Sequence, residues 1–164
     1  MKTLFLVRHA KAGWENAQLP DFERTLTDQG RHESTAMARR LFNKGVKPEL
    51  IVSSPATRAL QTAEIFADRL GYPPEQILQK VGIYEGDVDT LAGIVRELPK
   101  ELGTVMLFGH NPTISQFASW LTGKQVGQME TCSVVQFDMG KGRWASVKKE
   151  SGKVVWAGNP KNGQ

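Results

Sequence analysis

The chain has 164 residues, of which 40% are hydrophobic and 23% are charged, and its formal net charge is +4. This length suits one domain with a continuous core, and the composition is ordinary for a soluble globular protein. No apolar stretch approaches the roughly 18 residues that a membrane helix needs. The chain also has no basic stripe with interleaved aromatic residues, so we expect neither a membrane nor a nucleic-acid partner.

The one cysteine and the first residues indicate the compartment. Cys132 has no second cysteine with which to form an internal disulfide, which is typical of a reducing cytoplasm. Its apolar neighbours favour a small buried residue over a nucleophile. Because Met1-Lys2-Thr3 leads directly into an apolar run, we expect no signal peptide and a cytoplasmic protein.

The first third of the chain predicts a strand, a long loop and a helix. Residues 3–8 are continuously apolar up to Arg8, which is typical of a fully buried strand. Residues 9–26 predict a loop whose length is usual in functional segments. A helix over residues 28–44 is indicated by its apolar spacing, with Thr27 as N-cap and Gly45 as the stop.

The middle of the chain continues with a strand over residues 50–53. Ser54-Pro55 has the form of an N-cap followed by proline at the first helical position, and Gly71 closes the helix that follows. Residues 76–84 predict a strand or an extended segment. Residues 88–98 have apolar side chains at helical spacing.

The last third begins with a second continuously apolar strand over residues 104–109, after which Asn111-Pro112 repeats the N-cap and proline signal. Three further strands are predicted, over residues 132–139, 143–150 and 153–158. The last two would form a hairpin that turns at Ser151-Gly152, and the polar tail Asn159–Gln164 is expected to fray.

This order of elements predicts the fold class. Strands that alternate with helices imply a mostly parallel sheet covered on both faces. We therefore expect one α/β domain over residues 1–164, a three-layer α/β/α sandwich with an antiparallel hairpin at one edge of the sheet.

Cationic and imidazole side chains follow three of the predicted strands. Arg8 and His9 end the first strand, Arg58 lies in the first turns of the helix after the second, and His110 follows residues 104–109. The carboxyl ends of parallel strands meet at one edge of a sheet, where ligands bind. A phosphoryl group carries close to two negative charges, and the guanidinium fork and helix N-termini suit its oxygens. The sequence thus predicts a phosphoryl pocket.

The nucleophile of this pocket is found by elimination. The chain has no C-x5-R loop, no Asp-x-Asp after a strand and no cluster with metal-ligand spacing. A neutral imidazole is nucleophilic near neutral pH, and a phosphorylated histidine passes its group on to water. His9 is therefore the candidate nucleophile, with His110 as a second imidazole that bonds the phosphoryl oxygens.

Each of these residues also has a plainer interpretation. Arg8 and His9 alone could be a surface pair, Arg58 an exposed helix residue, and His110 a helix cap. Their recurrence at one predicted edge favours a site. His32 lacks that context, and we expect it to be solvated.

Three segments carry a resemblance to a known family. Val7-Arg8-His9-Ala10-Lys11, the segment from Ser53 to Thr62, and Gly109-His110-Asn111 resemble the histidine phosphatase superfamily. Within it, Asp21–Gly30 resembles the SixA-type phosphohistidine phosphatases. The resemblance implies a phosphoglycerate-mutase-like fold, His9 as the phosphorylated nucleophile, a phosphate pocket of Arg8, Arg58 and His110, and no metal or organic cofactor. Ala10 departs from the usual Arg-His-Gly signature, which affects the expected loop conformation more than the chemistry.

The proton donor for the leaving group has two candidates. Glu85 lies near where many relatives carry their acid, although it could equally be an exposed loop carboxylate. Asp21 is a lesser candidate, and it could instead pair with Arg24 to hold the long loop over the pocket. A phosphoramidate such as phosphohistidine needs less help from an acid because its leaving imidazole departs more easily.

Three functions fit these residues. The first is a phosphatase that acts through a phosphohistidine on His9. Its substrate would be phosphohistidine in a partner protein, because the short chain leaves little insertion from which to build a deep lid. The second is a phosphatase of small phosphate esters. The third is a non-catalytic module that recognises phosphorylated partners, which the intact set of four core residues disfavours.

Overall fold

The computed structural model describes residues 1–14 and 18–162. A six-stranded sheet runs through the molecule, with the strand order β3-β2-β4-β1-β5-β6. The strands are β1 (Lys2–Arg8), β2 (Leu50–Ser53), β3 (Leu78–Gln79), β4 (Thr104–Gly109), β5 (Val134–Gly140) and β6 (Lys153–Gly158). The α-helices are α1 (Asp28–Asn43), α2 (Thr57–Leu70), α3 (Val81–Glu85), α4 (Val88–Arg96) and α5 (Thr113–Thr122).

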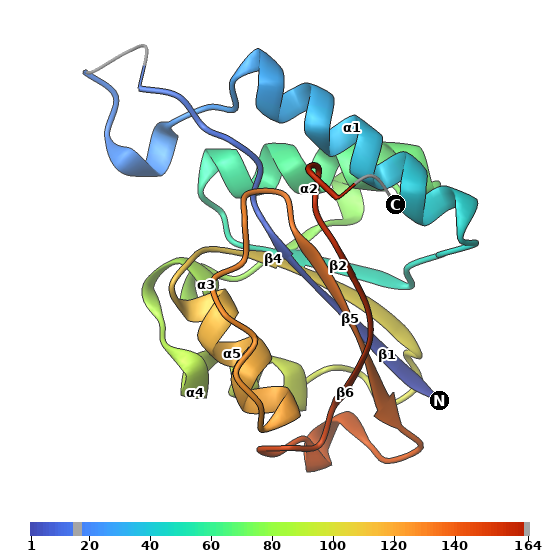
Figure 1. The fold of residues 1–164 in the computed structure, drawn as a ribbon. Helices are drawn as coiled ribbons and strands as arrows, with labels where there is room; N and C mark the ends of the chain where they lie inside the picture. Colours follow the sequence, from blue (N-terminus) through green and yellow to red (C-terminus); the bar gives the residue numbers. More distant parts are fainter. Residues whose placement is uncertain (15–17, 163–164) are drawn as a thin grey trace.

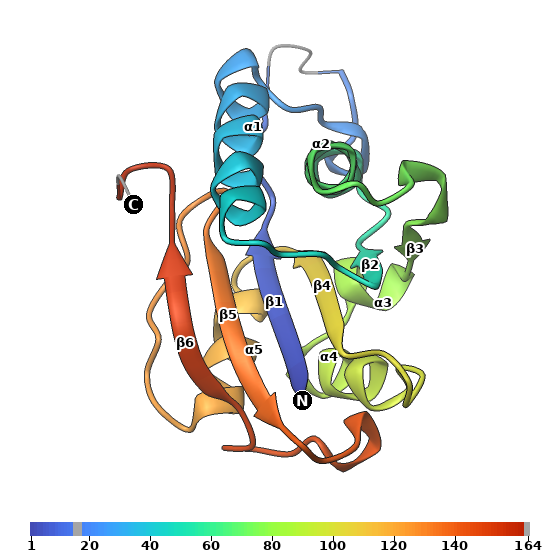
Figure 2. The same cartoon turned by 90° about the vertical axis from the view of Figure 1, so that its right-hand side faces the viewer.

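Helices cover both faces of the sheet, as the two views in Figures 1 and 2 show. Helices α1 and α2 pack on one face, where Phe66 and Phe108 belong to the same core cluster. Helices α3, α4 and α5 pack on the other face, where Phe117 joins Leu107. The predicted three-layer α/β/α architecture is confirmed. None of the described helices is long and apolar enough to cross a membrane.

Four neighbouring strands are parallel, and their register aligns the edge that carries the site. Arg8 of β1 pairs with Gly109 of β4, and Ser53 of β2 pairs with Phe108. These three strands therefore end almost level with one another. Because both faces of β1 and β4 are covered, every residue along their centres must be apolar, which explains the continuous runs.

The segment before the first long helix is anchored by a close approach. Thr27 caps α1 as predicted, with its side chain accepting a hydrogen bond from the Gly30 amide at 2.9 Å. A Cβ atom at Gly30 would lie 2.2 Å from the carbonyl oxygen of Lys11. Only glycine lets the start of α1 pack this tightly against the chain that leaves His9, so this contact fixes the base of the 9–26 loop.

The antiparallel edge differs in part from the prediction. Strand β5 is antiparallel to β1, and β6 is antiparallel to β5. The predicted strand over residues 143–150 is wrong, because Trp144–Ser146 forms a 3-10 turn and β6 pairs with β5 instead. Trp144 is fully buried, and its indole nitrogen donates to the Leu102 carbonyl at 2.8 Å. Residues 144–146 therefore contribute a buried side chain to the core and do not form a strand of the sheet.

The extended segment predicted over residues 76–84 is also mostly wrong. Only Leu78–Gln79 forms a strand, and Val81–Glu85 is a short helix. Buried Ile83 belongs to the core on the α4 and α5 face. The short helix directs the Ile83 side chain into this core. A short apolar run does not by itself distinguish a helix from a strand, which is why the prediction failed here.

Candidate active site

The structure brings His9 and His110 together at the carboxyl edge of the parallel strands. Their ring centroids are 5.1 Å apart. The backbone N–H of His9 donates to the Gly109 carbonyl at 3.1 Å, which extends the pairing of β1 with β4 by one residue. The two imidazoles therefore owe their proximity directly to the sheet.

His9 is held as a neutral ring with a defined tautomer. Its Nδ1 lies 2.8 Å from the carbonyl oxygen of Ala10, and because a carbonyl can only accept, Nδ1 carries the hydrogen. The lone pair is then on Nε2. His9 is 7% exposed, and burial, aided by the nearby His110 and Arg58, lowers its pKa to about 3 despite the bond to Ala10. The ring is neutral at pH 7.

Ala10 occupies the third position of the signature segment without strain. The residue is fully buried, and its N–H donates to the Thr62 hydroxyl of α2 at 3.0 Å. That hydroxyl donates in turn to the Arg58 carbonyl at 2.8 Å. The loop after β1 is thus tied to the helix that carries Arg58.

Arg58 lies in the first turn of α2 and is 6% exposed. Its Nη1 donates to the main-chain oxygen of Asp21 at 2.8 Å, and its Nη2 lies 3.1 Å from the Asp21 carboxylate. The same carboxylate accepts from Arg24 at 3.1 Å and from the Tyr84 hydroxyl at 2.9 Å. The hypothesis that Asp21 pairs with Arg24 is confirmed.

These contacts keep the Asp21 carboxylate ionised. Partial burial opposes the charged form, but the hydrogen bonds from Tyr84 and Arg58 and the charge of Arg58 together lower the pKa of Asp21. A carboxylate of this kind is an anion at neutral pH rather than a proton donor. The 9–26 loop thus places a negative charge against Arg58.

Arg8, the last residue of β1, is held differently. Its Nη1 donates to the main-chain carbonyl of Met129 at 3.0 Å. Burial lowers the pKa of Arg8, the charge of Arg58 adds to this, and Glu130 opposes it. Because arginine is a very strong base, the guanidinium still carries its charge at neutral pH.

His110 is fixed by a buried serine. Its Nε2 lies 2.7 Å from the hydroxyl of Ser54, which is fully buried and also accepts the Ala56 N–H at 3.1 Å. Burial, followed by the charge of Arg58, lowers the pKa of His110 to about 4, so this ring is also neutral at pH 7.

The predicted helix caps are wrong at both helix starts near the site. Helix α2 begins at Thr57 with Ala56 at the cap position, and α5 begins at Thr113 with Pro112 there. The polar side chains of Ser54 and Asn111 instead bind His110 and the Met129 carbonyl. Both residues precede proline, yet they orient the site rather than start the helices.

Three buried polar atoms of the site have no hydrogen-bond partner among the described residues: Nε of Arg8, Nε of Arg58 and Nδ1 of His110. A buried polar group without a partner is uncommon in a folded protein. All three atoms belong to side chains of the constellation at His9. An anion with several oxygens is the kind of ligand that would satisfy such a set.

The remaining candidates lie outside this constellation. Glu85 ends α3 with an exposed side chain and makes no hydrogen bond or ion pair to any residue that the structure describes. His32 is exposed on α1, as predicted. Cys132 is fully buried, and burial raises the pKa of its thiol to about 12, which confirms the prediction of an unreactive core residue.

Sequence reasoning missed several residues that orient the site. Ser54, Thr62 and Met129 have side chains or main-chain groups bonded to its members. A buried hydroxyl on an apolar helix face, as at Thr62, is the one signal that could have pointed to such a role. Met129 acts through its carbonyl oxygen, which every residue has, so no sequence signal marks it. No three His, Cys, Asp or Glu side chains in the described part of the chain are grouped so as to hold a metal.

Fold and site define the class: an α/β protein with two neutral imidazoles and two guanidinium groups at the carboxyl edge of its parallel strands. The family model of the histidine phosphatase superfamily (branch 1) matches residues 4–94. The chain belongs to the histidine phosphatase superfamily.

Individual relatives agree with this assignment. The solved structure of the protein histidine phosphatase SixA complexed with tungstate is 26% identical, with a TM-score of 0.81 over 96% of this chain and 97% of that chain. An uncharacterized chloroplastic protein of Arabidopsis thaliana is 26% identical over 94% of this chain and 74% of its own length.

The 2,3-bisphosphoglycerate-dependent phosphoglycerate mutase of Brucella ovis is 32% identical over 58% of this chain. The match covers 48% of the mutase, so this chain spans about half the length of that relative. Relatives of both kinds support a phosphatase or mutase-like activity on phosphorylated substrates.

Proposed function

We propose that this protein is a phosphatase that forms a covalent phosphohistidine on His9 and that its substrate is phosphohistidine in a partner protein. The observation that carries the proposal is the His9 ring itself. It is buried and neutral, and its proton is held on Nδ1 by the Ala10 carbonyl, so the lone pair of Nε2 is available beside Arg8, Arg58 and His110.

In the first step, the Nε2 lone pair of His9 attacks phosphorus and an Nε2–P bond forms. The bond from phosphorus to the substrate nitrogen breaks, and its electron pair leaves with the imidazole of the substrate. That imidazole takes a proton from solvent or arrives already protonated, so a dedicated acid is dispensable. His9 is left as a phosphohistidine.

In the second step, water attacks the phosphohistidine. An O–P bond forms, the Nε2–P bond breaks, and its electron pair returns to Nε2. The water proton passes to solvent or to the released phosphate. Nδ1 keeps its hydrogen and donates it to the Ala10 carbonyl throughout, which keeps the ring in one orientation in both steps.

Arg8, Arg58 and His110 would bind the oxygens of the transferred group. Charge on these oxygens is spread around phosphorus in the transition state, and fixed donors in a buried site stabilise it without reorganisation. The unpartnered donors of Arg8 and Arg58 support this role. The Asp21 carboxylate already bonds one side of the Arg58 guanidinium. An incoming phosphoryl group must therefore share this guanidinium with Asp21 or displace the carboxylate from it.

The rim around the site supports a protein substrate. Trp14 is 65% exposed with the Arg24 guanidinium 3.8 Å from its ring centroid, and Phe22 packs edge-on to Tyr84 with their centroids 5.0 Å apart. Trp14 and Phe22 are exposed at this rim, and aromatic side chains are enriched where proteins meet. The likeness to SixA supports the same class of substrate.

The proposal also covers the compartment of the enzyme and the role of Glu85. The single cysteine suits a reducing compartment, and we place the enzyme in the cytoplasm as one domain. Glu85 would matter only for substrates whose leaving group needs a proton. The mutase relatives favour the second candidate, a small phosphate ester as substrate.

The test compares kcat/KM for a phosphohistidine protein, a phospholysine peptide and simple phosphate esters. We expect the phosphohistidine protein to be preferred, and acid-labile phosphate to be trapped on His9 after rapid quenching. His9→Ala should abolish turnover with the fold retained, while His32→Ala, which removes an exposed histidine, should not change it. Better turnover of small esters would favour the second candidate. Turnover by His9→Ala would overturn the mechanism. If the unmodified protein turned over none of these substrates, the result would favour the non-catalytic module that recognises phosphorylated partners.

A further inference from the structure

The loop that leads from α5 to β5 (residues 123–133) contacts Arg8 and supplies the only hydrogen-bond acceptor of the Arg8 guanidinium in the described part of the chain. Met129 of this loop is 4% exposed. Its carbonyl oxygen accepts from Arg8 Nη1 at 3.0 Å and from Asn111 Nδ2 at 2.8 Å. A carbonyl oxygen has two lone pairs, so these two donors fill it.

Ser115 completes the arrangement from the first turn of α5. Its hydroxyl oxygen accepts the Met129 N–H at 2.8 Å, and its proton is donated to Asn111 Oδ1. The N–H and the C=O of Met129 are therefore both held, by Ser115 and Asn111, and the two holders are bonded to each other. The three residues form a closed ring of hydrogen bonds.

The ring fixes the orientation of the Asn111 amide. Because the Ser115 proton points to Oδ1, the amide NH2 must face the Met129 carbonyl. The flipped amide would place two oxygens against each other and would leave the Ser115 proton without an acceptor. The Met129 carbonyl is thus aimed at Arg8 by side chains that do not touch Arg8 themselves.

We propose that Asn111 and Ser115 are positioning residues that hold the Arg8 guanidinium in place through the main chain of Met129. Among the described residues, the Met129 carbonyl oxygen is the only hydrogen-bond partner of that guanidinium, and the direction of this bond decides where the remaining N–H groups of Arg8 point. The inference rests on the proposed function only in assigning phosphoryl binding to Arg8.

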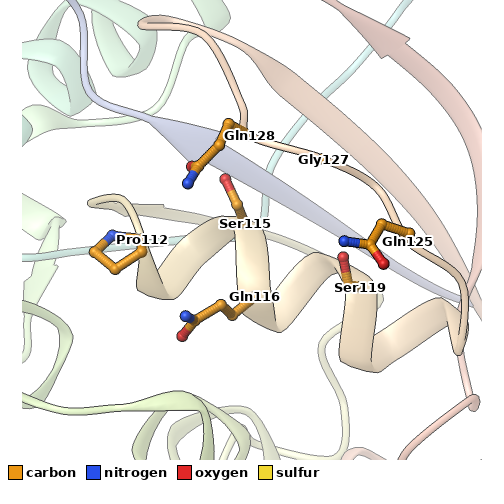
Figure 3. A pocket seen from close by; sticks show the side chains of 7 residues that line it. All are labelled: Pro112, Ser115, Gln116, Ser119, Gln125, Gly127 and Gln128. Carbon is orange, nitrogen blue, oxygen red and sulfur yellow. The ribbon is translucent and has the colours of Figure 1, made fainter.

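The same helix offers a matched control. Ser119 lies one turn beyond Ser115, and its hydroxyl accepts the Val126 N–H at 2.9 Å, so it pins the same loop farther from Arg8. Figure 3 shows both serines on the side of α5 that faces residues 125–128, around a cavity of about 320 Å³. Ser115→Ala and Ser119→Ala remove the same chemical group from the same helix and loop, but only Ser115 connects to Arg8.

The cavity also provides a rescue variant. Ser115 lines it together with Gln116 and Gln128. The additional methyl group of Ser115→Thr has this space to enter, while the hydroxyl is kept. Ser115→Thr should therefore behave like the unmodified protein, whereas a purely steric effect of substitution at this position would make it the worse of the two variants.

The experiment measures the dissociation constant of inorganic phosphate by calorimetry and the solvent exchange of the Arg8 Nε–H by NMR. That resonance is assigned by its loss in Arg8→Lys. We expect Ser115→Ala and Asn111→Ala to weaken phosphate binding about tenfold, as the loss of one ordered charged hydrogen bond implies, and to accelerate the exchange. Ser119→Ala should change either by less than about twofold. Thermal melts and circular dichroism establish that each variant is folded.

The outcomes separate this inference from the proposed function. Unchanged Arg8 exchange in folded Ser115→Ala, or equal losses in Ser115→Ala and Ser119→Ala, would overturn the positioning role, whatever the turnover. The expected changes in a protein without phosphatase activity would support the positioning role and refute the proposed function. Should the unmodified protein not bind phosphate, the role assigned to Arg8 fails and the inference with it.

Discussion

Arg8 and Arg58 flank the same histidine, but two different parts of the molecule hold them. The 9–26 loop holds Arg58 with the carboxylate and the main-chain oxygen of Asp21. The loop between α5 and β5 holds Arg8 with the uncharged carbonyl of Met129. Among the described residues the Arg8 guanidinium makes no ion pair and feels Glu130 only through its charge, whereas Arg58 is paired directly with an anion that competes for it.

The charge difference also has a structural origin. Met129 is held by Asn111 and by Ser115 of α5 through hydrogen bonds between neutral groups, which are insensitive to salt. Asp21 lies on an exposed 3-10 turn. Its carboxylate accepts hydrogen bonds from the side chains of Arg24, Arg58 and Tyr84, none of which belongs to the turn. The Asp21 side chain is 46% exposed, and ion pairs that reach the solvent are weakened by salt, so the Asp21 side of the site is the more adaptable one.

Removing either arginine should give the largest effect. We expect Arg58→Ala and Arg8→Ala each to lower kcat/KM by about 10²-fold or more, because each removes a fixed donor to the transition state. Arg69→Ala, which removes an exposed arginine from the same helix as Arg58, is the control and should be neutral. A loss for Arg58→Ala much smaller than for Arg8→Ala would mean that Asp21 keeps Arg58 from acting on the substrate.

Acidification should weaken the fold through the buried rings. Below pH 6.5 an imidazole in the unfolded chain gains a proton, whereas His9 in the folded protein stays neutral down to about pH 3. Stability therefore falls as the pH is lowered through this window, by about 2 kcal/mol at pH 5 for His9 alone. Urea unfolding at pH 7 and pH 5 measures this loss.

The matched variants for this measurement are His9→Gln and His32→Gln. We expect His9→Gln to lose less stability between the two pH values, and His32→Gln, at an exposed position, to lose as much as the unmodified protein. For the same reason the acid limb of kcat/KM should lie well below pH 6.5. An acid limb at pH 6.5 would contradict the lowered pKa of His9, because it would show that burial and the two arginines do not disfavour the protonated ring.

Neutralising Asp21 should remove the difference between the two arginines. With Asp21→Asn the anionic competitor at Arg58 is gone, and we expect inorganic phosphate to bind several-fold more tightly at low salt, with the gain shrinking as salt is added. Glu23→Gln makes the same charge change in the same exposed turn without touching Arg58, and it is the control. Weaker phosphate binding by Asp21→Asn would mean that Asp21 is needed to orient Arg58.

Glu85→Gln should have the smallest effect. With a phosphohistidine substrate we expect kcat/KM to change by less than about twofold, because the leaving imidazole needs no dedicated acid. With an alkyl phosphate ester the same variant should lose more if Glu85 donates a proton. A tenfold loss on phosphohistidine would instead make Glu85 the acid for this reaction.

Much of the fold followed from local sequence patterns. The continuous apolar runs of β1 and β4, the Thr27 cap of α1 and the glycine that ends α2 each express a local rule, and each was predicted. The errors came where a local pattern was ambiguous. The segment around Ile83 is apolar and short. In the segment around Trp144 the two buried apolar side chains, Trp144 and Val147, pack into the core from a 3-10 turn rather than from a strand.

The sequence by itself determined which side chains the site contains, because parallel strands bring the residues that follow them to one edge. Arg8, His9 and His110 could be named for that reason, and Arg58 because it lies in the first turn of the helix that follows β2. Only the tertiary structure decided how each is held: the tautomer of His9, the carboxylate against Arg58 and the carbonyl against Arg8. These contacts join segments far apart in the chain, and one of them uses a main-chain oxygen that every residue possesses, so no local pattern encodes them.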